Sequence, residues 1–195
     1  MKIILASNNS NKVREIKKMF EGTDIQIVGL KDVAFYDEIE ENGKTFTENA
    51  YIKAKTIYDI YNIPVISDDS GLVVDALNGE PGVYSARWSG KGDEANNDKL
   101  LRKMKNKTNR KANYTCVICY YGGPNEVEFF EGICYGEIGF ERYGTGGFGY
   151  DPLFVLNGGP DTFATISLEE KNKMSHRSIA VNKLAEYLLK KNKSI

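Results

Sequence analysis

A short, mostly apolar run leads directly into two adjacent carboxylates. The run covers residues 63–67, the acids are Asp68 and Asp69, and Ser70 and Gly71 follow at once. This pattern predicts a strand that ends at the acids and then turns, at the kind of sheet edge where α/β proteins receive ligands. Two like charges this close cost free energy unless a cation, a proton or a basic partner offsets them. Mg²⁺ is a suitable cation, because it prefers oxygen ligands and keeps waters for a phosphate substrate. The alternative interpretation is a solvated Asp-Asp turn.

Composition limits the remaining function classes. The chain has 195 residues, which is enough for one domain with a core, and its 41% hydrophobic and 27% charged residues are ordinary for a globular protein. The net charge of −1 gives no electrostatic reason to expect DNA or RNA as a partner. No apolar run approaches membrane-spanning length, and the first seven residues are too short a run for a signal peptide. We therefore expect a cytoplasmic protein with neither a nucleic-acid nor a membrane partner.

The three cysteines do not form a disulfide framework. Cys116 and Cys119 make a C-x-x-C pattern, but they lie in a run that predicts a strand. Residues three apart on a strand point to opposite faces, so we predict that this pair neither bridges nor shares a metal. His176 is the only histidine, which excludes a metal site built from several histidines.

Strands and helices are predicted along the whole chain from periodicity and capping signals. The predicted helices are 11–20, 45–61, 93–105 and 178–191, with a helical turn at 167–173. The predicted strands are 2–7, 25–30, 63–67, 112–121, 126–137 and 153–156. Thr45 and Glu48 have the spacing of a capping box at the start of the second helix. The middle strands could form a second lobe, which would leave a cleft suited to a small ligand.

The loop after the first predicted strand is a candidate phosphate site. Its residues are Ser7, Asn8, Asn9, Ser10 and Asn11. Backbone N–H groups and the helix dipole favour an anion at a helix N-terminus. Lys12 adds a positive charge in the first turn, where an acid would normally be more favourable. A phosphate ligand explains that charge, and a plain polar loop with a solvated lysine is the alternative.

Lys53 falls on the apolar stripe of the second predicted helix, between Ala50 and Ile57. A lysine at this spacing either reaches to solvent along the helix or serves as a fixed cation beside a phosphate.

The segment 144–152 is rich in glycine and formally contains G-x-G-x-x-G. Tyr150, Asp151 and Pro152 cannot open the helix that a dinucleotide fingerprint requires, and no P-loop motif occurs. The segment predicts a flexible loop that closes over a flat ring, with Phe148 as the stacking surface. A glycine-rich β-turn is the alternative.

Hydrogen-bond donors gather near the start of the last helix, at Lys171 and at residues 175–178. No acid lies near His176 in sequence, so a Ser-His-Asp triad is not supported. Metal-assisted hydrolysis of a phosphoanhydride fits the whole set better. Cationic and N–H groups would hold phosphates, and carboxylates would hold Mg²⁺ and activate water. The donors near the last helix would hold a nucleobase.

Several motifs, taken in this order over the whole length, resemble the inosine triphosphate pyrophosphatase family. They are Ser7-Asn8-Asn9-x-x-Lys12, Glu40-Glu41-x-Gly43, Thr45-Phe46-x-Glu48-Asn49-Ala50-x-x-Lys53-Ala54, Ser67-Asp68-Asp69-Ser70-Gly71-Leu72, Pro81-Gly82-x-Tyr84-Ser85-Ala86-Arg87, Gly146-Gly147-Phe148-Gly149-Tyr150-Asp151-Pro152 and Ser175-His176-Arg177. Family members often have Thr-Gly-Asn in the first loop. Asn8 replaces that glycine here, and asparagine is the residue after glycine that best tolerates a left-handed backbone.

The resemblance implies an α/β fold, elongated and two-lobed, with a mixed twisted central sheet flanked by helices. Residues 1–195 would form a single domain of two lobes, with the active site in the cleft between them. The implied protein is a homodimer that uses Mg²⁺ to hydrolyse purine nucleoside triphosphates. The implied reaction converts ITP, dITP or XTP to the monophosphate and pyrophosphate.

The resemblance also implies roles for individual residues. The implied phosphate ligands are Ser7, Asn8, Asn9, Ser10, Asn11, Lys12 and Lys53. Glu40 and Asp69 would ligate Mg²⁺ with the support of Asp68, and Asp69 would be the catalytic base for the attacking water. The other implied substrate contacts are Ser70, Arg87, Phe148, Gly149, Tyr150, Asp151, Lys171, His176 and Arg177. Two alternatives stay open: a septum-inhibitor-type pyrophosphatase acting on other nucleotides, and a nucleotide-binding module without turnover.

Overall fold

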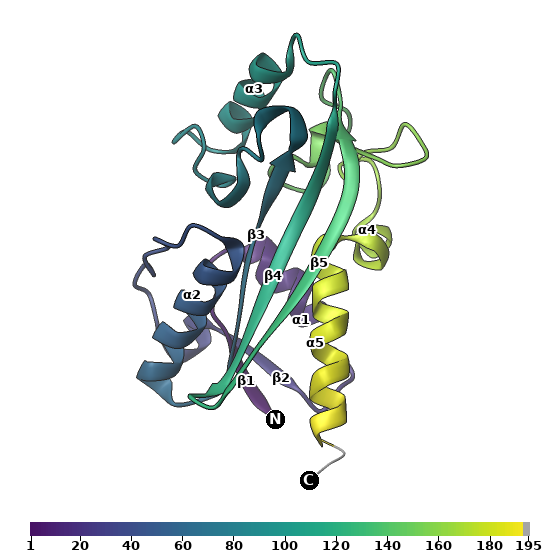
Figure 1. Ribbon diagram of the computed structural model, residues 1–195. Coiled ribbons are helices and arrows are strands. Elements are labelled where there is room, and N and C mark those ends of the chain that lie inside the picture. Colours follow the sequence, from purple (N-terminus) through teal and green to yellow (C-terminus); the bar gives the residue numbers. More distant parts are fainter. Residues whose placement is uncertain (193–195) are drawn as a thin grey trace. The chain divides into compact units, whose positions relative to one another are not determined.

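The computed structural model describes residues 1–192 (Figure 1). Within these residues the chain forms six strands and five α-helices. In chain order they are β1 (Lys2–Leu5), α1 (Ser10–Met19), β2 (Gln26–Gly29), α2 (Phe46–Tyr61), β3 (Val65–Val74), α3 (Asp93–Met104), β4 (Lys111–Gly123), β5 (Glu126–Ile138), β6 (Phe154–Leu156), α4 (Leu168–Met174) and α5 (His176–Asn192).

All six strands belong to one sheet, in the order β2-β1-β3-β4-β5-β6. Strand β1 pairs in parallel with β2 and with β3, whereas β5 and β6 are antiparallel. The sheet is therefore mixed, which confirms the predicted α/β class. None of the helices in residues 1–192 is both long enough and apolar enough to cross a bilayer.

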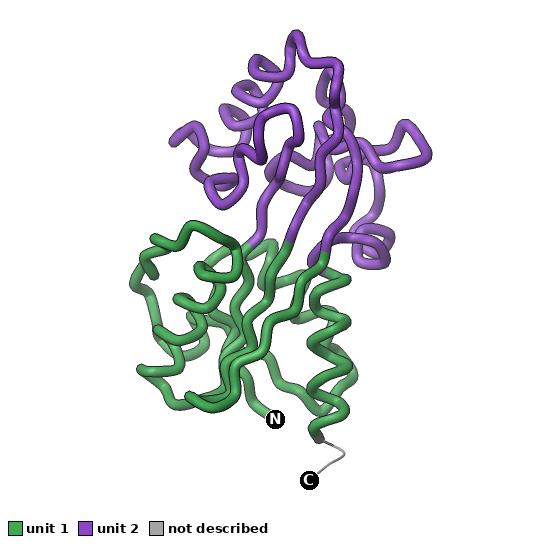
Figure 2. The backbone as a smooth tube through the Cα atoms, viewed as in Figure 1, with its two compact units in different colours: residues 1–69, 116–132, 178–195 green, residues 70–115, 133–177 purple. Residues whose placement is uncertain are grey.

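The chain divides into two compact units (Figure 2). Among the described residues, unit 1 contains 1–69, 116–132 and 178–192, and unit 2 contains 70–115 and 133–177. Strands β3, β4 and β5 each contribute residues to both units. Each unit is described by itself below.

Helices cover both faces of the sheet in unit 1. Cys116 of β4 lies in an apolar cluster with Ile16 of α1 and Leu184 of α5, whereas Cys119 lies in a second cluster with Ala54 of α2. In Figure 1, α2 and α5 accordingly lie on opposite sides of the strands. The prediction that the two cysteines point to opposite faces is confirmed. Burial raises the pKa of the Cys119 thiol to about 12, as expected for a core residue.

Helix α2 begins where the capping signal predicts. The Thr45 side chain accepts a hydrogen bond from the Glu48 backbone N–H, and Glu48 reciprocates at the Thr45 N–H. The helix ends at Asn62, which has a left-handed backbone that stops the chain from continuing as a helix. This register places Asn49 and Lys53 on the buried side of the helix.

The prediction that the strand ends at Asp68 and Asp69 is wrong. Strand β3 runs from Val65 to Val74, so both acids lie inside it. The strand continues because Leu72 and Val74, beyond the acids, are fully buried in the core of unit 2 and require extended backbone to reach it. What ends near the acids is the neighbouring strand, since Leu5, the last residue of β1, is paired with Ile66. The acids therefore follow the carboxyl end of β1.

The last helix also differs from its prediction. It begins at His176 instead of Ser178 and follows α4 after the single residue Ser175. Residues 175–178 are all buried, and residues 176–178 belong to the first turn of α5.

Candidate functional site

The acid pair of β3 is deeply buried in unit 1. Asp68 is fully buried, and its carboxylate lies 3.0 Å from the Lys12 ammonium. Lys12 is in the first turn of α1, where the Asn9 side chain caps the helix by accepting the N–H groups of Asn11 and Lys12. The positive charge that was unexpected at this helix end is thus balanced by a buried carboxylate of the next strand in the sheet.

Lys53 is the second cation of this cluster. Its ammonium donates to the Asp68 carbonyl at 2.6 Å and lies 2.8 Å from the Glu41 carboxylate. Burial lowers the pKa of Lys53, but the carboxylates of Asp68, Asp69 and Glu41 together raise it above its ordinary value. Lys53 is therefore a fixed, buried cation and does not reach to solvent along the helix, and its role beside a phosphate stays a prediction.

Asp69 lies between these charges. Burial raises the pKa of Asp69. The ammonium groups of Lys53 and Lys12 and a 3.0 Å hydrogen bond from the Asn49 amide lower it, but the balance stays above the ordinary value. A buried carboxylate that binds a proton more readily than usual is the type of group that can accept one in a reaction.

Asn49 was not predicted as a site residue. Its amide nitrogen donates to Asp69, and its amide oxygen accepts the Gly43 N–H at 2.8 Å. A Cβ on Gly43 would stand only 2.6 Å from that amide oxygen, so glycine is required at this position. Asn49 therefore connects Asp69 to the segment that carries Glu41. The available signal was its spacing, because Asn49 precedes Lys53 by one helical turn on the alanine-rich face of α2.

Donor chemistry suggests which metal this cluster could accept. The described residues contain no group of three or more His, Cys, Asp or Glu side chains close enough to hold an ion, and Glu40 is exposed. Asp68, Asp69 and Glu41 all act on the Lys53 ammonium, and these carboxylates offer oxygen ligands. Oxygen donors suit Mg²⁺, whereas Zn²⁺ usually takes nitrogen or sulfur. The assignment of Glu40, Asp68 and Asp69 to a metal stays a prediction.

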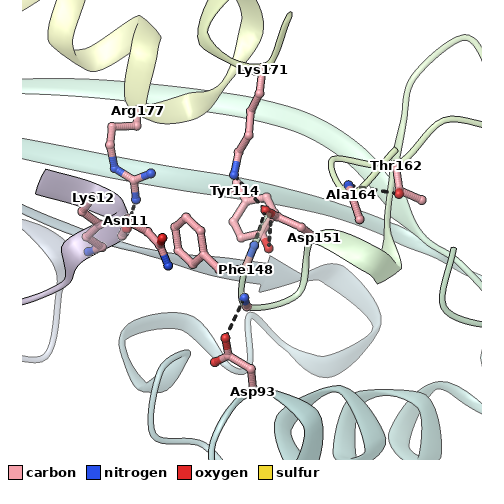
Figure 3. Close-up of polar contacts among 12 residues, drawn as sticks. Asn11, Lys12, Asp93, Tyr114, Phe148, Asp151, Thr162, Ala164, Lys171 and Arg177 are labelled. Atoms are coloured by element: carbon pink, nitrogen blue, oxygen red, sulfur yellow. Dashed lines mark hydrogen bonds and ion pairs between the residues drawn. The ribbon is translucent and has the colours of Figure 1, made fainter. Parts of the chain in front are cut away.

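A second cluster lies in unit 2 around a buried ion pair (Figure 3). The Lys171 ammonium lies 2.8 Å from the Asp151 carboxylate, and both side chains are at most 5% exposed. The same carboxylate oxygen accepts the Phe148 N–H at 2.9 Å, and the Tyr114 hydroxyl approaches the other oxygen at 3.4 Å. Asp151 thereby links the glycine-rich loop to α4.

Cations flank the ring of Phe148. The Lys171 ammonium lies 4.7 Å from the ring centroid, and the Arg177 guanidinium carbon lies 5.9 Å from it. Arg177 is only 2% exposed and donates to the Ser70 hydroxyl at 3.2 Å. The structure thus brings together the predicted residues Ser70, Phe148, Asp151, Lys171 and Arg177. They combine an aromatic face with hydrogen-bond donors.

Three other predicted residues of unit 2 have different surroundings. Tyr150 is a core residue of this unit. His176 is buried and stacks on the Tyr114 ring at 4.7 Å with an interplanar angle of 10°. Arg87 is exposed and lies over the ring of Tyr84.

The first loop is open to solvent in unit 1. Asn8, Asn9 and Ser10 are exposed, and the Asn9 N–H donates to the Ser7 hydroxyl. The Asn11 side chain accepts a hydrogen bond from Arg14.

Asp93 and Asn97 were also missed, and both contact the glycine-rich loop. The Asp93 carboxylate accepts the Gly149 N–H at 2.8 Å, and the Asn97 amide donates to the Gly149 carbonyl at 2.9 Å. They are 56 and 52 positions from Gly149 in the chain, so no local pattern could have connected them.

The fold is α/β with a mixed sheet. One unit holds a buried lysine–carboxylate cluster, and the other holds an aromatic ring flanked by cations. These features define a candidate nucleotide-binding protein. The sequence model of the Ham1 family matches residues 3–187, so the chain belongs to the Ham1 family.

Relatives resemble the chain over nearly its full length. A dITP/XTP pyrophosphatase of Staphylococcus aureus is 45% identical over 188 residues, which cover 95% of each chain. A dITP/XTP pyrophosphatase of Christiangramia forsetii is 46% identical over 192 residues, which cover 97% of this chain and 100% of the relative. The solved structure of the Staphylococcus aureus Ham1 protein matches with a TM-score of 0.89 at 43% identity and covers 98% of this chain and 100% of that chain.

Proposed function

We propose that the protein is a nucleoside triphosphate pyrophosphatase that removes noncanonical purine nucleotides from the nucleotide pool. Its substrates are ITP, dITP and XTP, and its products are the monophosphate and pyrophosphate. The observation that carries this proposal is the full-length similarity, at 45–46% identity, to proteins named dITP/XTP pyrophosphatases. The chemistry of the two clusters supports it independently.

The cluster in unit 1 supplies the groups for the triphosphate. Lys12 and Lys53 offer two ammonium charges, and the first loop offers backbone N–H groups and hydroxyls. Glu40 and Asp69 would hold Mg²⁺, with Asp68 as support. Mg²⁺, when bound, supplies charge neutralisation on the triphosphate oxygens. The salt bridge to Lys12 at 3.0 Å holds the Asp68 carboxylate in place beside Asp69.

The reaction is a displacement at the α-phosphorus. A water oxygen forms a bond to that phosphorus, and the bond from the α-phosphorus to the bridging oxygen of the β-phosphate breaks. The water proton passes to the Asp69 carboxylate, and pyrophosphate leaves as one unit. Asn49 orients Asp69 through its 3.0 Å hydrogen bond, so the catalytic base is held in position before substrate binds.

The cluster in unit 2 supplies the groups that bind the nucleobase. The ring of Phe148 offers a stacking surface, and Lys171 and Arg177 offer donors to the oxygen at C6 of hypoxanthine or xanthine. Adenine carries an amino group at C6, which would face these donors and leave them without an acceptor. Buried donors without acceptors are costly, so adenine should be rejected.

The test is a product analysis with a panel of nucleotides. The purified protein should convert ITP, dITP and XTP to the monophosphate and pyrophosphate, and reaction in ¹⁸O-water should place the label in the monophosphate. Sequential release of orthophosphate would overturn the proposed bond cleavage. Preference for pyrimidine or standard nucleotides would favour the septum-inhibitor-type enzyme, and binding without any turnover would favour a regulatory module.

Activity is expected to require Mg²⁺ and to rise towards alkaline pH. Burial raises the pKa of Asp69. A carboxylate base works only when it is ionised, so activity should be lost as the pH falls through this raised pKa. The measurement is turnover of ITP after dialysis against a chelator, followed by addition of Mg²⁺ or Zn²⁺. Full activity in the chelated protein would contradict the metal requirement.

Arg177→Ala is expected to reduce discrimination between bases. The wild type should favour dITP and XTP over dATP by at least roughly tenfold in kcat/KM, because one modest polar contact is worth about that ratio. The variant should lose more activity towards dITP than towards dATP. Equal hydrolysis of dITP and dATP by the wild type would mean that this cluster does not read the base.

The proposal also includes two properties that the family resemblance implies, a homodimer and a cytoplasmic location. Sedimentation of the purified protein tests the first, and the three free cysteines are compatible with the reducing conditions of the second.

A further inference from the structure

The dipeptide formed by Phe148 and Gly149 has every backbone hydrogen-bonding group satisfied. The Phe148 N–H donates to the Asp151 carboxylate at 2.9 Å, and the Phe148 carbonyl accepts the Asp151 N–H at 3.2 Å. The Gly149 N–H donates to Asp93 at 2.8 Å, and the Gly149 carbonyl accepts from Asn97 at 2.9 Å. Half of these contacts are made by Asp151 and half by one face of α3.

Asp93 and Asn97 are one helical turn apart, so they lie on the same side of α3. From there Asp93 contacts the Gly149 N–H and Asn97 contacts the Gly149 carbonyl. Gly149 has a φ of +63°, a left-handed conformation that is one of several open to glycine, so contacts of this kind help to select it. Because the Phe148 and Gly149 backbones share a peptide bond, fixing Gly149 also fixes the direction in which the Phe148 side chain leaves the backbone.

Asn97 has a chemical feature that a purely structural role leaves unexplained. It is 1% exposed, and within residues 1–192 its amide oxygen has no hydrogen-bond partner. A buried amide with one end unsatisfied costs free energy that an apolar side chain would avoid. The neighbouring Asn96, by contrast, is bonded at both ends, to the Ser89 N–H and to the carbonyls of Ser85 and Ala86. The Asn97 side chain donates its hydrogen bond to the Gly149 carbonyl.

We propose that Asp93 and Asn97 are positioning residues that hold Gly149 and thereby fix the Phe148 ring for stacking on the base. This inference rests on the proposed function. It predicts that the two residues act on the nucleoside part of a ligand and not on its phosphates.

The experiment compares two inhibitors of ITP hydrolysis, inorganic tripolyphosphate and IMP. The variants are Asp93→Ala, Asp93→Asn and Asn97→Ala. Glu94→Gln is the matched control, because it removes a carboxylate from the same first turn of α3 while its side chain, 84% exposed and paired with Arg142, does not contact Gly149. Fluorescence of Trp88, the only tryptophan of the chain and a residue of unit 2, reports whether each variant is folded.

Asp93→Ala and Asn97→Ala should each raise the KM for ITP and the inhibition constant for IMP about tenfold, the upper end of what one hydrogen bond contributes. The inhibition constant for tripolyphosphate should change less than about twofold, a ratio below what one contact provides. Asp93→Asn should recover part of the affinity for IMP, because its amide oxygen still accepts the Gly149 N–H. Glu94→Gln should behave as the wild type.

Equal losses for IMP and tripolyphosphate, or unchanged constants for both, would overturn the inference. If Asn97→Ala does not fold, the Asp93 variants decide, since Asp93 is exposed and its loss leaves the core intact. Failure of the proposed function is separate, because the wild type would then show no pyrophosphate release from ITP at all.

Discussion

Asp69→Asn is expected to keep the fold and to lower kcat for ITP by on the order of 10²-fold or more, the contribution of a positioned general base. The amide oxygen of the new side chain can still accept the hydrogen bond from Asn49, so unit 1 should retain its structure. The amide cannot accept the proton of the attacking water. The measurement is kcat for ITP, with circular dichroism as the check on folding.

Asp59→Asn is the matched control for this substitution. Asp59 is an exposed acid of α2 in the same unit, paired with Lys55, and its neutralisation should leave kcat within about twofold of the wild type, since an exposed ion pair contributes little. Near-normal turnover by a folded Asp69→Asn protein would rule out Asp69 as the base.

Lys171→Met is expected to lower the free energy of unfolding of unit 2 by about 3–5 kcal/mol, the usual cost of leaving one partner of a buried ion pair without the other. The physical reason is the 2.8 Å contact with Asp151, in which both side chains are nearly inaccessible to solvent. The measurement is denaturant unfolding followed by the fluorescence of Trp88, which belongs to the same unit.

Two further variants separate the ion pair from general damage to α4. Lys173→Met removes an exposed lysine of the same helix, which lies 3.6 Å from Glu169, and should cost less than about 1 kcal/mol. Lys171→Met combined with Asp151→Asn should be more stable than Lys171→Met alone, because no buried charge is left without a partner. A double variant as unstable as the single one would show that the loss comes from packing and not from charge.

Much of the architecture could be predicted from the sequence because local signals were strong. The capping box at Thr45, the apolar stripe around Lys53 and the alternation through Cys116 and Cys119 each depend on residues close together in the chain. The end of β3 could not be predicted in this way. Asp68 and Asp69 have the composition of a turn, whereas pairing within the sheet and the burial of Leu72 favour an extended backbone there.

The residues of the candidate sites could likewise be predicted only in part. Lys12, Asp68 and Lys53 were singled out from charge patterns, and the structure brings them together. Asn49 and Asn97 could not be predicted as site residues from charge patterns, because an amide side chain is neutral. Their roles depend on partners that the chain brings close only when folded, such as Gly149, which is 52 positions from Asn97.

The division of the chain has a consequence for its synthesis on the ribosome. Unit 2 lies wholly between residues 70 and 177, whereas unit 1 needs the first residues of the chain, a middle segment and the chain from 178 onward. Leu184 and Leu188 of α5 fill part of the unit 1 core, so that core cannot close until α5 has been synthesised. The segment with Lys12 and Asp68 is made before α5 and must wait for it with its apolar residues uncovered. Since nascent chains with exposed apolar surface are prone to aggregation, we expect holdase chaperones to engage this segment first.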